Sequence, residues 1–297
     1  MQGLLSQITS FDRSALAPTT TVVRHATAIT GETTALGFDD EEQKEFRDTE
    51  EDVKKKAAML SEWIVQSRCA VVYTGAGIST AADVPDYRGG QGIWTLRDKG
   101  YEPLVDIDLA SKQPTASHRL ITLLHQQGYV KYLISTNTDN LHRRSGFPPA
   151  ALAELHGNCF IERCDNCSKT FVRPQRVSQV RGDHLTGNYC EEKSCCSKRF
   201  PLRDTVVGFG ENLPIRALAD AEKWSEEADL TIVLGSSMRV RPSCEMPAKC
   251  VRTGAGKMVI VNLQKTPYDE EATLRIGADI DEVMKQVANN MNDTLTN

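Results

Sequence analysis

The stretch CAVVYTGAGIS, residues 69–79, decides the fold class of the chain. Its first six residues form a short apolar run rich in β-branched side chains, which is typical of a buried strand. The glycines that follow directly are typical of a strand-to-helix turn at which backbone N–H groups approach a phosphate. A tight turn with no ligand would have the same composition. Gly75, Ala76 and Gly77 are therefore candidate cofactor contacts that need support from the rest of the chain.

Further runs of the same kind predict four more strands, at residues 130–136, 204–209, 230–237 and 257–263. Helical periodicity separates several of them, notably over 114–127 and 215–227. Strands that alternate with helices predict a parallel sheet covered on both faces. The predicted fold class is therefore α/β, with a Rossmann-like parallel sheet.

Residues 157–203 interrupt this alternation with cysteines, charges and turn residues, and we interpret them as a smaller inserted module. The Rossmann-like domain then comprises residues 45–156 and 204–290, followed by a C-terminal tail over 291–297. Residues 1–44 are expected to form a disordered or weakly ordered tail. A mitochondrial or plastid transit peptide is the alternative, although such a peptide would be richer in arginine.

The composition is that of an ordinary soluble globular protein, with 40% hydrophobic and 25% charged residues. No apolar run reaches the roughly eighteen residues that a membrane-spanning helix needs, so we expect no membrane contact. The net charge of −5 argues against indiscriminate binding to nucleic acid, which needs a basic surface. Any nucleic-acid contact should be indirect or weak. The oligomeric state is not predicted.

The cysteines predict one structural zinc ion. Five of the nine lie close together in the inserted module, as Cys164, Cys167, Cys190, Cys195 and Cys196. Two clusters of thiolates supply the four tetrahedral ligands that structural zinc prefers. Either Cys195 or Cys196 is the fourth ligand. This uneven distribution also differs from a secreted disulfide framework and indicates a reducing compartment.

With these features in place, the chain resembles the sirtuin family over residues 45–290. The matching segments are GAGISTAADVPDYRG (75–89), TNTDNLHRRSG (136–146), LHGN (155–158), the cysteine module, LRDTVVGFGENLP (202–214), LGSSMRVRP (234–242) and IVNLQ (260–264). The segment GIWTLRDKG (92–100) looks most like the class IV sirtuins, the chromatin-associated branch. The resemblance implies NAD as co-substrate beside the structural zinc.

The resemblance also implies a role for each matching residue. The NAD-binding positions are Gly75, Ala76, Gly77, Thr80, Asp86, Tyr87, Arg88, Trp94, Thr136, Gly235, Ser236, Ser237, Asn262, Gln264 and Ile280. Asn137 and Asp139 match the pair that shapes the nicotinamide pocket, and His156 matches the general base. The residues that resemble the strand pairing with a substrate peptide are Val207, Phe209, Gly210 and Glu211.

The implied activity is NAD-dependent protein lysine deacylation, in which nicotinamide is released and the acyl group is transferred to ADP-ribose. The implied partners are acylated lysine peptides, with histone tails or other nuclear proteins as substrates and the nucleus as location. A protein mono-ADP-ribosyltransferase and a catalytically weak chromatin-binding scaffold are the alternatives. A hydride-transferring dehydrogenase is disfavoured, because no acidic residue follows the glycine turn at the usual ribose-binding distance.

Two positions depart from the family pattern in ways that bear on turnover. Thr136 stands where the family usually carries glutamine, whose longer amide reaches the ribose hydroxyls. We expect weaker placement of the nicotinamide ribose as a result. Asn140 stands for a glycine, which matters less because asparagine tolerates a left-handed backbone.

Overall fold

The computed structural model of the chain describes residues 24–25, 44–90, 92–102, 107–177, 183–196, 198–254 and 256–296. The expected N-terminal tail, with its transit-peptide alternative, lies outside these residues except for one short strand and Lys44. That strand, β1 (Arg24–His25), pairs antiparallel with β3 (Tyr101–Glu102). None of the described helices is long and apolar enough to cross a membrane.

The main sheet has six parallel strands, which confirms the predicted fold class. In spatial order they are β12 (Leu274–Ile276), β11 (Lys257–Val261), β10 (Leu230–Leu234), β2 (Ala70–Thr74), β4 (Val130–Ser135) and β5 (Leu152–Glu154). The central strands β2 and β10 are buried along their whole length, as expected of strands covered on both faces. The chain leaves β2 toward β4 and later returns on its other side through β10. The crevice between the ends of β2 and β10 is therefore the topological switch point of the sheet.

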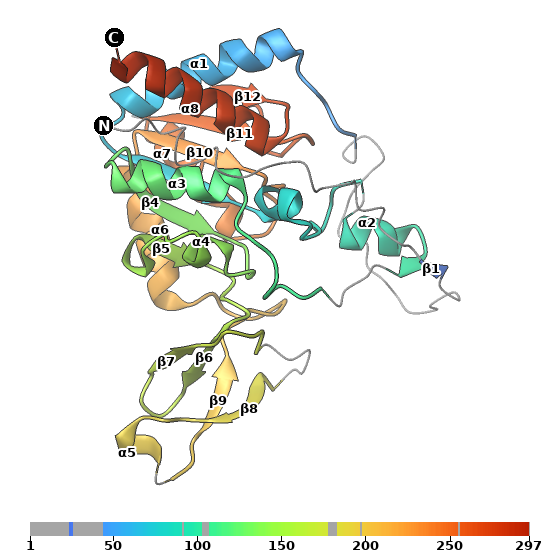
Figure 1. Cartoon of the computed structure of the whole chain (residues 1–297), viewed down its shortest axis with the longest axis vertical. Coiled ribbons are helices and arrows are strands. Elements are labelled where there is room, and N and C mark those ends of the chain that lie inside the picture. The colour runs from blue at the N-terminus through green and yellow to red at the C-terminus, as the bar shows by residue number, and fades with distance from the viewer. Residues whose placement is uncertain are drawn as a thin grey trace.

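Helices cover both faces of this sheet (Figure 1). On one face, α1 (Glu50–Gln66), α3 (Ala116–Gln126) and α8 (Ile280–Thr296) bury their apolar stripes in one core with the strands. On the other face lie α6 (Ile215–Glu227) and α7 (Lys249–Arg252). The shorter helical segments are α2 (Ile93–Asp98), α4 (Leu141–Arg144), and the 3₁₀ turns η1 (Ala76–Ala82), η2 (Pro149–Ala151) and η3 (Ser243–Glu245).

The cysteine-rich insert forms a separate antiparallel sheet at the lower end of the molecule in Figure 1. Its strands, in spatial order, are β7 (Thr170–Val172), β6 (Ile161–Cys164), β9 (Pro201–Asp204) and β8 (Leu185–Tyr189), with the short helix α5 (Lys193–Cys196) after β8. A small core made largely of cysteines and Leu202 holds this sheet together.

Two sequence-based expectations were wrong. The run 204–209 was expected to be a strand, but β9 ends at Asp204 and residues 205–209 leave the small sheet as a loop. Residues 291–297 were expected to be a tail, but α8 continues to Thr296 and Met291 on it is fully buried against the main core. Met291 belongs to the same buried core as residues of α1, and this contact between distant segments could not be recognised from the local sequence.

Candidate functional site

A cavity of about 380 Å³ opens at the carboxyl ends of the parallel strands, between the main sheet and the loop that follows β9. The switch-point rule places a ligand site at this crevice. The cavity gathers most of the residues proposed from the sequence. They are Gly75, Ala76, Gly77, Asp86, Tyr87, Arg88, Trp94, Thr136, Asn137, His156, Val207, Phe209, Gly210, Glu211, Gly235, Ser236, Ser237, Asn262 and Gln264.

Three of the proposed residues do not line the cavity. Thr80 is exposed, and its hydroxyl donates to the carbonyl of Gly77 at 2.9 Å. Ile280 backs onto Gly235, where a Cβ would lie 2.6 Å from the Ile280 Cδ1 atom. Asp139 is buried behind the site and acts through another residue. The cavity also has lining residues to which the sequence analysis assigned no role, although most of them lie within the quoted motifs: Tyr73, Thr138, Val206, Gly208, Leu213, Arg239, Val240, Arg241 and Ser243.

The glycines after β2 let two strand ends approach each other closely. The Gly75 N–H donates to the carbonyl of Leu234 at 3.0 Å, and the Gly77 N–H donates to that of Gly235 at 2.9 Å. A Cβ on Gly75 or Gly77 would lie 2.7–2.8 Å from the Gly235 backbone. The glycine requirement therefore arises first from packing between β2 and β10. The same absence of side chains leaves the backbone open toward the cavity.

His156 is held in the cavity as a neutral imidazole. Its Nδ1 lies 3.1 Å from the carbonyl oxygen of Thr136, an acceptor, so Nδ1 carries the proton and donates. Burial lowers the pKa of His156, and the Thr136 contact opposes this only in part. The neutral ring then presents an unprotonated Nε2. This is the state that a general base requires near neutral pH.

Asn137 is oriented by a chain of hydrogen bonds that ends at Asp139. The Asn137 Nδ2 donates to the carbonyl of Gly75 at 3.0 Å and lies 3.4 Å from the Ser79 hydroxyl. Ser79 donates to the Asp139 carboxylate at 2.7 Å. Burial raises the pKa of Asp139, which Ser79 partly offsets. Asp139 thus positions the Asn137 amide through Ser79, a residue that the sequence did not identify as part of the site.

Arg88 supplies positive charge to the cavity. Burial, followed by the nearby Arg239, lowers the pKa of Arg88 to about 10, so it remains protonated at neutral pH. Its guanidinium lies 4.5 Å from the ring centroid of Trp94 and 3.2 Å from the Ser237 hydroxyl. Gln264 donates to the Arg88 carbonyl at 2.8 Å. A fixed cation beside open backbone turns suits a pyrophosphate group.

The loop of residues 205–211, here called the substrate segment, forms the wall of the cavity nearest the cysteine module. The Val207 N–H donates to the carbonyl of His156 at 3.0 Å, and Phe209 is 75% exposed. The segment was expected to be a strand that pairs with a peptide. Residues 205–211 form a loop, and none of the described strands pairs with them.

The cysteine module holds a site for one structural zinc ion. The sulfur atoms of Cys164, Cys167, Cys190 and Cys195 all lie within 4.8 Å of one another. Cys167 and Cys190 are 3.7 Å apart, close to the roughly 3.8 Å edge of a tetrahedron with Zn–S bonds of about 2.3 Å. Cys195 is thus the fourth member of the cluster, and the side chain of Cys196 lies outside the described residues.

Comparisons with known proteins place these features in a family. The Sir2 family model matches residues 98–242. The chain is 39% identical to the NAD-dependent protein deacetylase SRT1 of Arabidopsis thaliana over 84% of its length, and 40% identical to the NAD-dependent protein deacetylase Sirt6 of Drosophila melanogaster over 81%. It is 41% identical to the NAD-dependent protein deacetylase sirtuin-7 of Mus musculus over 84%. The sirtuin-7 match is consistent with the class IV resemblance.

The coverage of these relatives is unequal. The chain spans 52% of the Arabidopsis protein, 76% of the Drosophila protein and 63% of the mouse protein. It thus spans about half the length of some of the curated relatives that it matches. Among solved structures, a Sir2 protein with a deacetylated p53 peptide and 3'-O-acetyl ADP-ribose has a TM-score of 0.63 and 31% identity. The match covers 80% of this chain and 99% of that one.

Proposed function

Because the chain belongs to the Sir2 family, the sirtuins, we propose that it is an NAD-dependent protein lysine deacylase. The reaction consumes one water molecule, transfers an acyl group from a lysine side chain to ADP-ribose, and releases nicotinamide and the free lysine amine. The observation that carries this proposal is the state of His156. Its Nδ1 proton is committed to the Thr136 carbonyl, which leaves Nε2 free to accept a proton inside the cavity.

Several polar groups of the cavity then have a role in the proposed reaction. After the acyl-lysine amide oxygen attacks the ribose carbon and nicotinamide leaves, His156 accepts a proton from a ribose hydroxyl. Asn137, fixed through Ser79 and Asp139, faces the nicotinamide end. Arg88 offsets part of the pyrophosphate charge beside the turn after β2, and we assign Asn262 and Gln264, which also line the cavity, to the adenosine half of NAD.

The experiment that tests this proposal compares the wild type with His156→Ala on a panel of acyl-lysine peptides, with nicotinamide release as the readout. We expect a loss of about a hundredfold or more in turnover, as is usual when a general base is removed. His125→Ala on α3, which alters a histidine outside the cavity, is the matched control. Equal turnover in the wild type and His156→Ala would contradict the role of His156 as general base.

Product analysis separates the alternatives. Deacylation yields free nicotinamide with acyl-ADP-ribose, whereas mono-ADP-ribosyl transfer leaves the ADP-ribose label on protein. A catalytically weak chromatin-binding scaffold would retain zinc and bind its partners without cleaving NAD.

The substrates and location belong to the same proposal. We propose that acylated lysines of histone tails or other nuclear proteins are the substrates and that the protein acts in the nucleus, with a mitochondrion or plastid as the alternative location. The class IV resemblance supports this choice. Deacetylation of intact histones, compared with non-histone acetyl-lysine proteins at equal concentration, tests it, and equal rates on both would count against histones as preferred substrates.

A further inference from the structure

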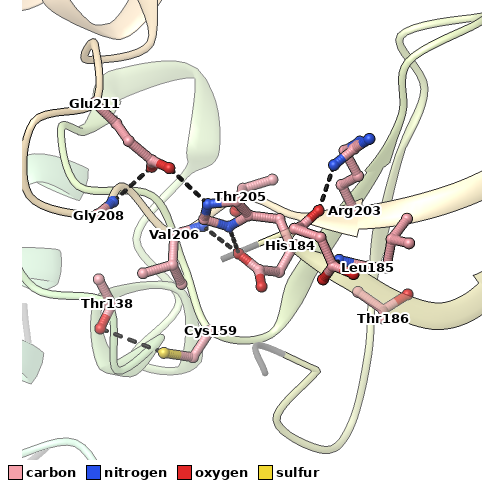
Figure 2. A network of polar contacts seen from close by, with 12 residues as sticks. Thr138, Cys159, His184, Leu185, Thr186, Arg203, Thr205, Val206, Gly208 and Glu211 are labelled. Carbon is pink, nitrogen blue, oxygen red and sulfur yellow. Dashed lines mark hydrogen bonds and ion pairs between the residues drawn. The ribbon is translucent and has the colours of Figure 1, made fainter. Parts of the chain in front are cut away.

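His184, directly before β8 in the cysteine module, contacts two carboxylates at once. Its Nδ1 lies 3.0 Å from Asp204 Oδ1, and its Nε2 lies 2.8 Å from Glu211 Oε1. Asp204 ends β9, whereas Glu211 belongs to the substrate segment. Figure 2 shows His184 beside Glu211, with Gly208 on the other side of that carboxylate. One imidazole thus joins the cysteine module to the substrate segment.

Glu211 passes this contact on to the backbone of the segment. Its Oε2 accepts from the Gly208 N–H at 2.7 Å, and its own N–H donates to the Gly208 carbonyl at 3.2 Å. These two bonds close a turn that contains Gly210, whose φ is +82°. The position of the Glu211 carboxylate therefore fixes the conformation of the turn of residues 208–211, which carries the exposed Phe209.

The substrate segment is a wall between two cavities. Val206, Val207 and Glu211 line both the 380 Å³ cavity of the proposed active site and a second cavity of about 810 Å³ on the other side, which His184 also lines. A wall with space on both sides cannot be held by close packing alone, so its position depends on specific bonds. The Val207 N–H to His156 carbonyl bond anchors its middle, and Glu211 with His184 anchors its far end.

The charges around His184 favour its protonated form. The Asp204 side chain is almost fully buried, and its Oδ1 also accepts from the Val206 N–H at 3.0 Å. Hydrogen bonds to Asp204 and then to Glu211 raise the pKa of His184. The two neighbouring charged side chains have other partners. The Asp183 carboxylate accepts from the Leu185 N–H, and the Arg203 guanidinium pairs with Asp165 at 2.8 Å. The imidazolium therefore has two carboxylate partners and no opposing cation among these contacts.

We propose that His184 is a positioning residue for the acylated peptide: by bridging Asp204 and Glu211 it fixes the substrate segment against the cysteine module. This rests on the proposed function, since it assumes that the peptide binds along that segment. His184 does not touch the reacting atoms, so its loss should weaken peptide binding while leaving chemistry and NAD binding in place.

The test measures the affinity of an acetyl-lysine peptide by calorimetry without NAD, and the KM values for peptide and NAD in turnover. His184→Ala should weaken peptide affinity by about twofold to fivefold, in keeping with loss of a partly exposed ion pair. The kcat and the KM for NAD should change by less than about twofold. The matched control is Lys169→Ala, which breaks the Lys169–Glu192 ion pair elsewhere in the module. Zinc content should be unchanged in both variants.

The pH dependence distinguishes a bridge from a general structural role. Because the pKa of His184 is raised in the folded protein, the bridge is present at lower pH and is lost as pH rises through that pKa. Wild-type peptide affinity should fall over this interval, whereas His184→Ala should be uniformly weak. His184→Arg, which stays charged and has several donors, should be uniformly strong.

Two outcomes would overturn the inference: peptide affinity unaffected by His184→Ala, or equal pH profiles for the wild type and His184→Ala. Failure of the proposed function is a separate result, because a wild type that releases no nicotinamide can still bind the peptide in the calorimetric arm. A double-mutant cycle with Glu211→Gln adds a further check, since two partners of one bridge should give non-additive losses.

Discussion

At the scale of single residues, Thr136 is the departure from the family pattern with the clearest consequence. Its hydroxyl donates to the carbonyl of Thr74 at 3.2 Å, and its backbone N–H donates to the same carbonyl at 3.1 Å. The side chain is therefore engaged with the end of β2. A glutamine here would be longer and could extend into the cavity that Thr136 lines.

Replacing Thr136 with glutamine should raise turnover. We expect kcat/KM for NAD to increase by about fivefold, which corresponds to one added hydrogen bond of about 1 kcal/mol to the ribose. Steady-state kinetics with a saturating acetyl-lysine peptide measures this change. Thr136→Val, which loses the bond to Thr74 without gaining reach, is the control and should not improve on the wild type. An unchanged kcat/KM in Thr136→Gln would show that the short side chain of Thr136 does not limit turnover.

The site residues that the sequence identified lie in motifs. The backbone conformation of Asn140 was also predicted correctly from its residue type. Its backbone has a φ of +67°, the left-handed conformation that asparagine was expected to tolerate. By contrast, Ser79 and His184 could not be assigned their contacts from the sequence. Their partners, Asp139 and Glu211, lie 60 and 27 residues away, and only the fold brings them together.

At the scale of elements, α5 resolves an ambiguity in the zinc site. The sequence offered Cys195 and Cys196 equally, because they are adjacent and chemically identical. In the structure the Cys195 sulfur joins the cluster and accepts from the Asn166 amide at 3.2 Å. Together with Cys164, Cys167 and Cys190, Cys195 completes the four tetrahedral ligands that structural zinc prefers.

Substitution of each cysteine in turn tests this selection. Cys195→Ser should lower bound zinc well below one ion per chain, because three thiolates leave the tetrahedral site incomplete. Cys196→Ser should retain one ion and the wild-type thermal stability. Elemental analysis of the purified variants measures zinc directly. Retention in Cys195→Ser with loss in Cys196→Ser would reverse the assignment.

Elements were predictable where one face of a helix or most of a strand is buried. Residues 215–227 and 130–136 were expected as a helix and a strand, and α6 and β4 lie there. The substrate segment was misjudged because its apolar residues Val206 and Val207 line cavities rather than pair in a sheet. Composition cannot separate an apolar loop wall from a short strand, since both bury similar side chains.

At the scale of the whole molecule, two buried histidines couple stability to pH. His118 on α3 and His142 on α4 have ring centroids 4.6 Å apart, and both side chains are almost fully buried. His142 Nε2 contacts the Thr74 hydroxyl at 2.8 Å, and His118 Nδ1 contacts the Thr115 hydroxyl at 2.8 Å. Burial lowers the pKa of His142 to about 3 and that of His118 well below its usual range.

The folded protein should therefore lose stability on mild acidification. Below the unfolded-state pKa of about 6.5 the unfolded chain binds protons that the folded pair does not, so the free energy of unfolding falls as pH falls. Each histidine contributes a slope of about 1.4 kcal/mol per pH unit, or about 2.8 for the pair. Urea unfolding at pH 7, 6 and 5 measures this slope, which His118→Gln or His142→Gln should each reduce by about half of the pair's contribution. Leu124→Ala, on the same helix but without a titratable group, should lower stability equally at every pH. If the glutamine variants keep the wild-type slope, the acid sensitivity arises from other groups and the pair is not its source.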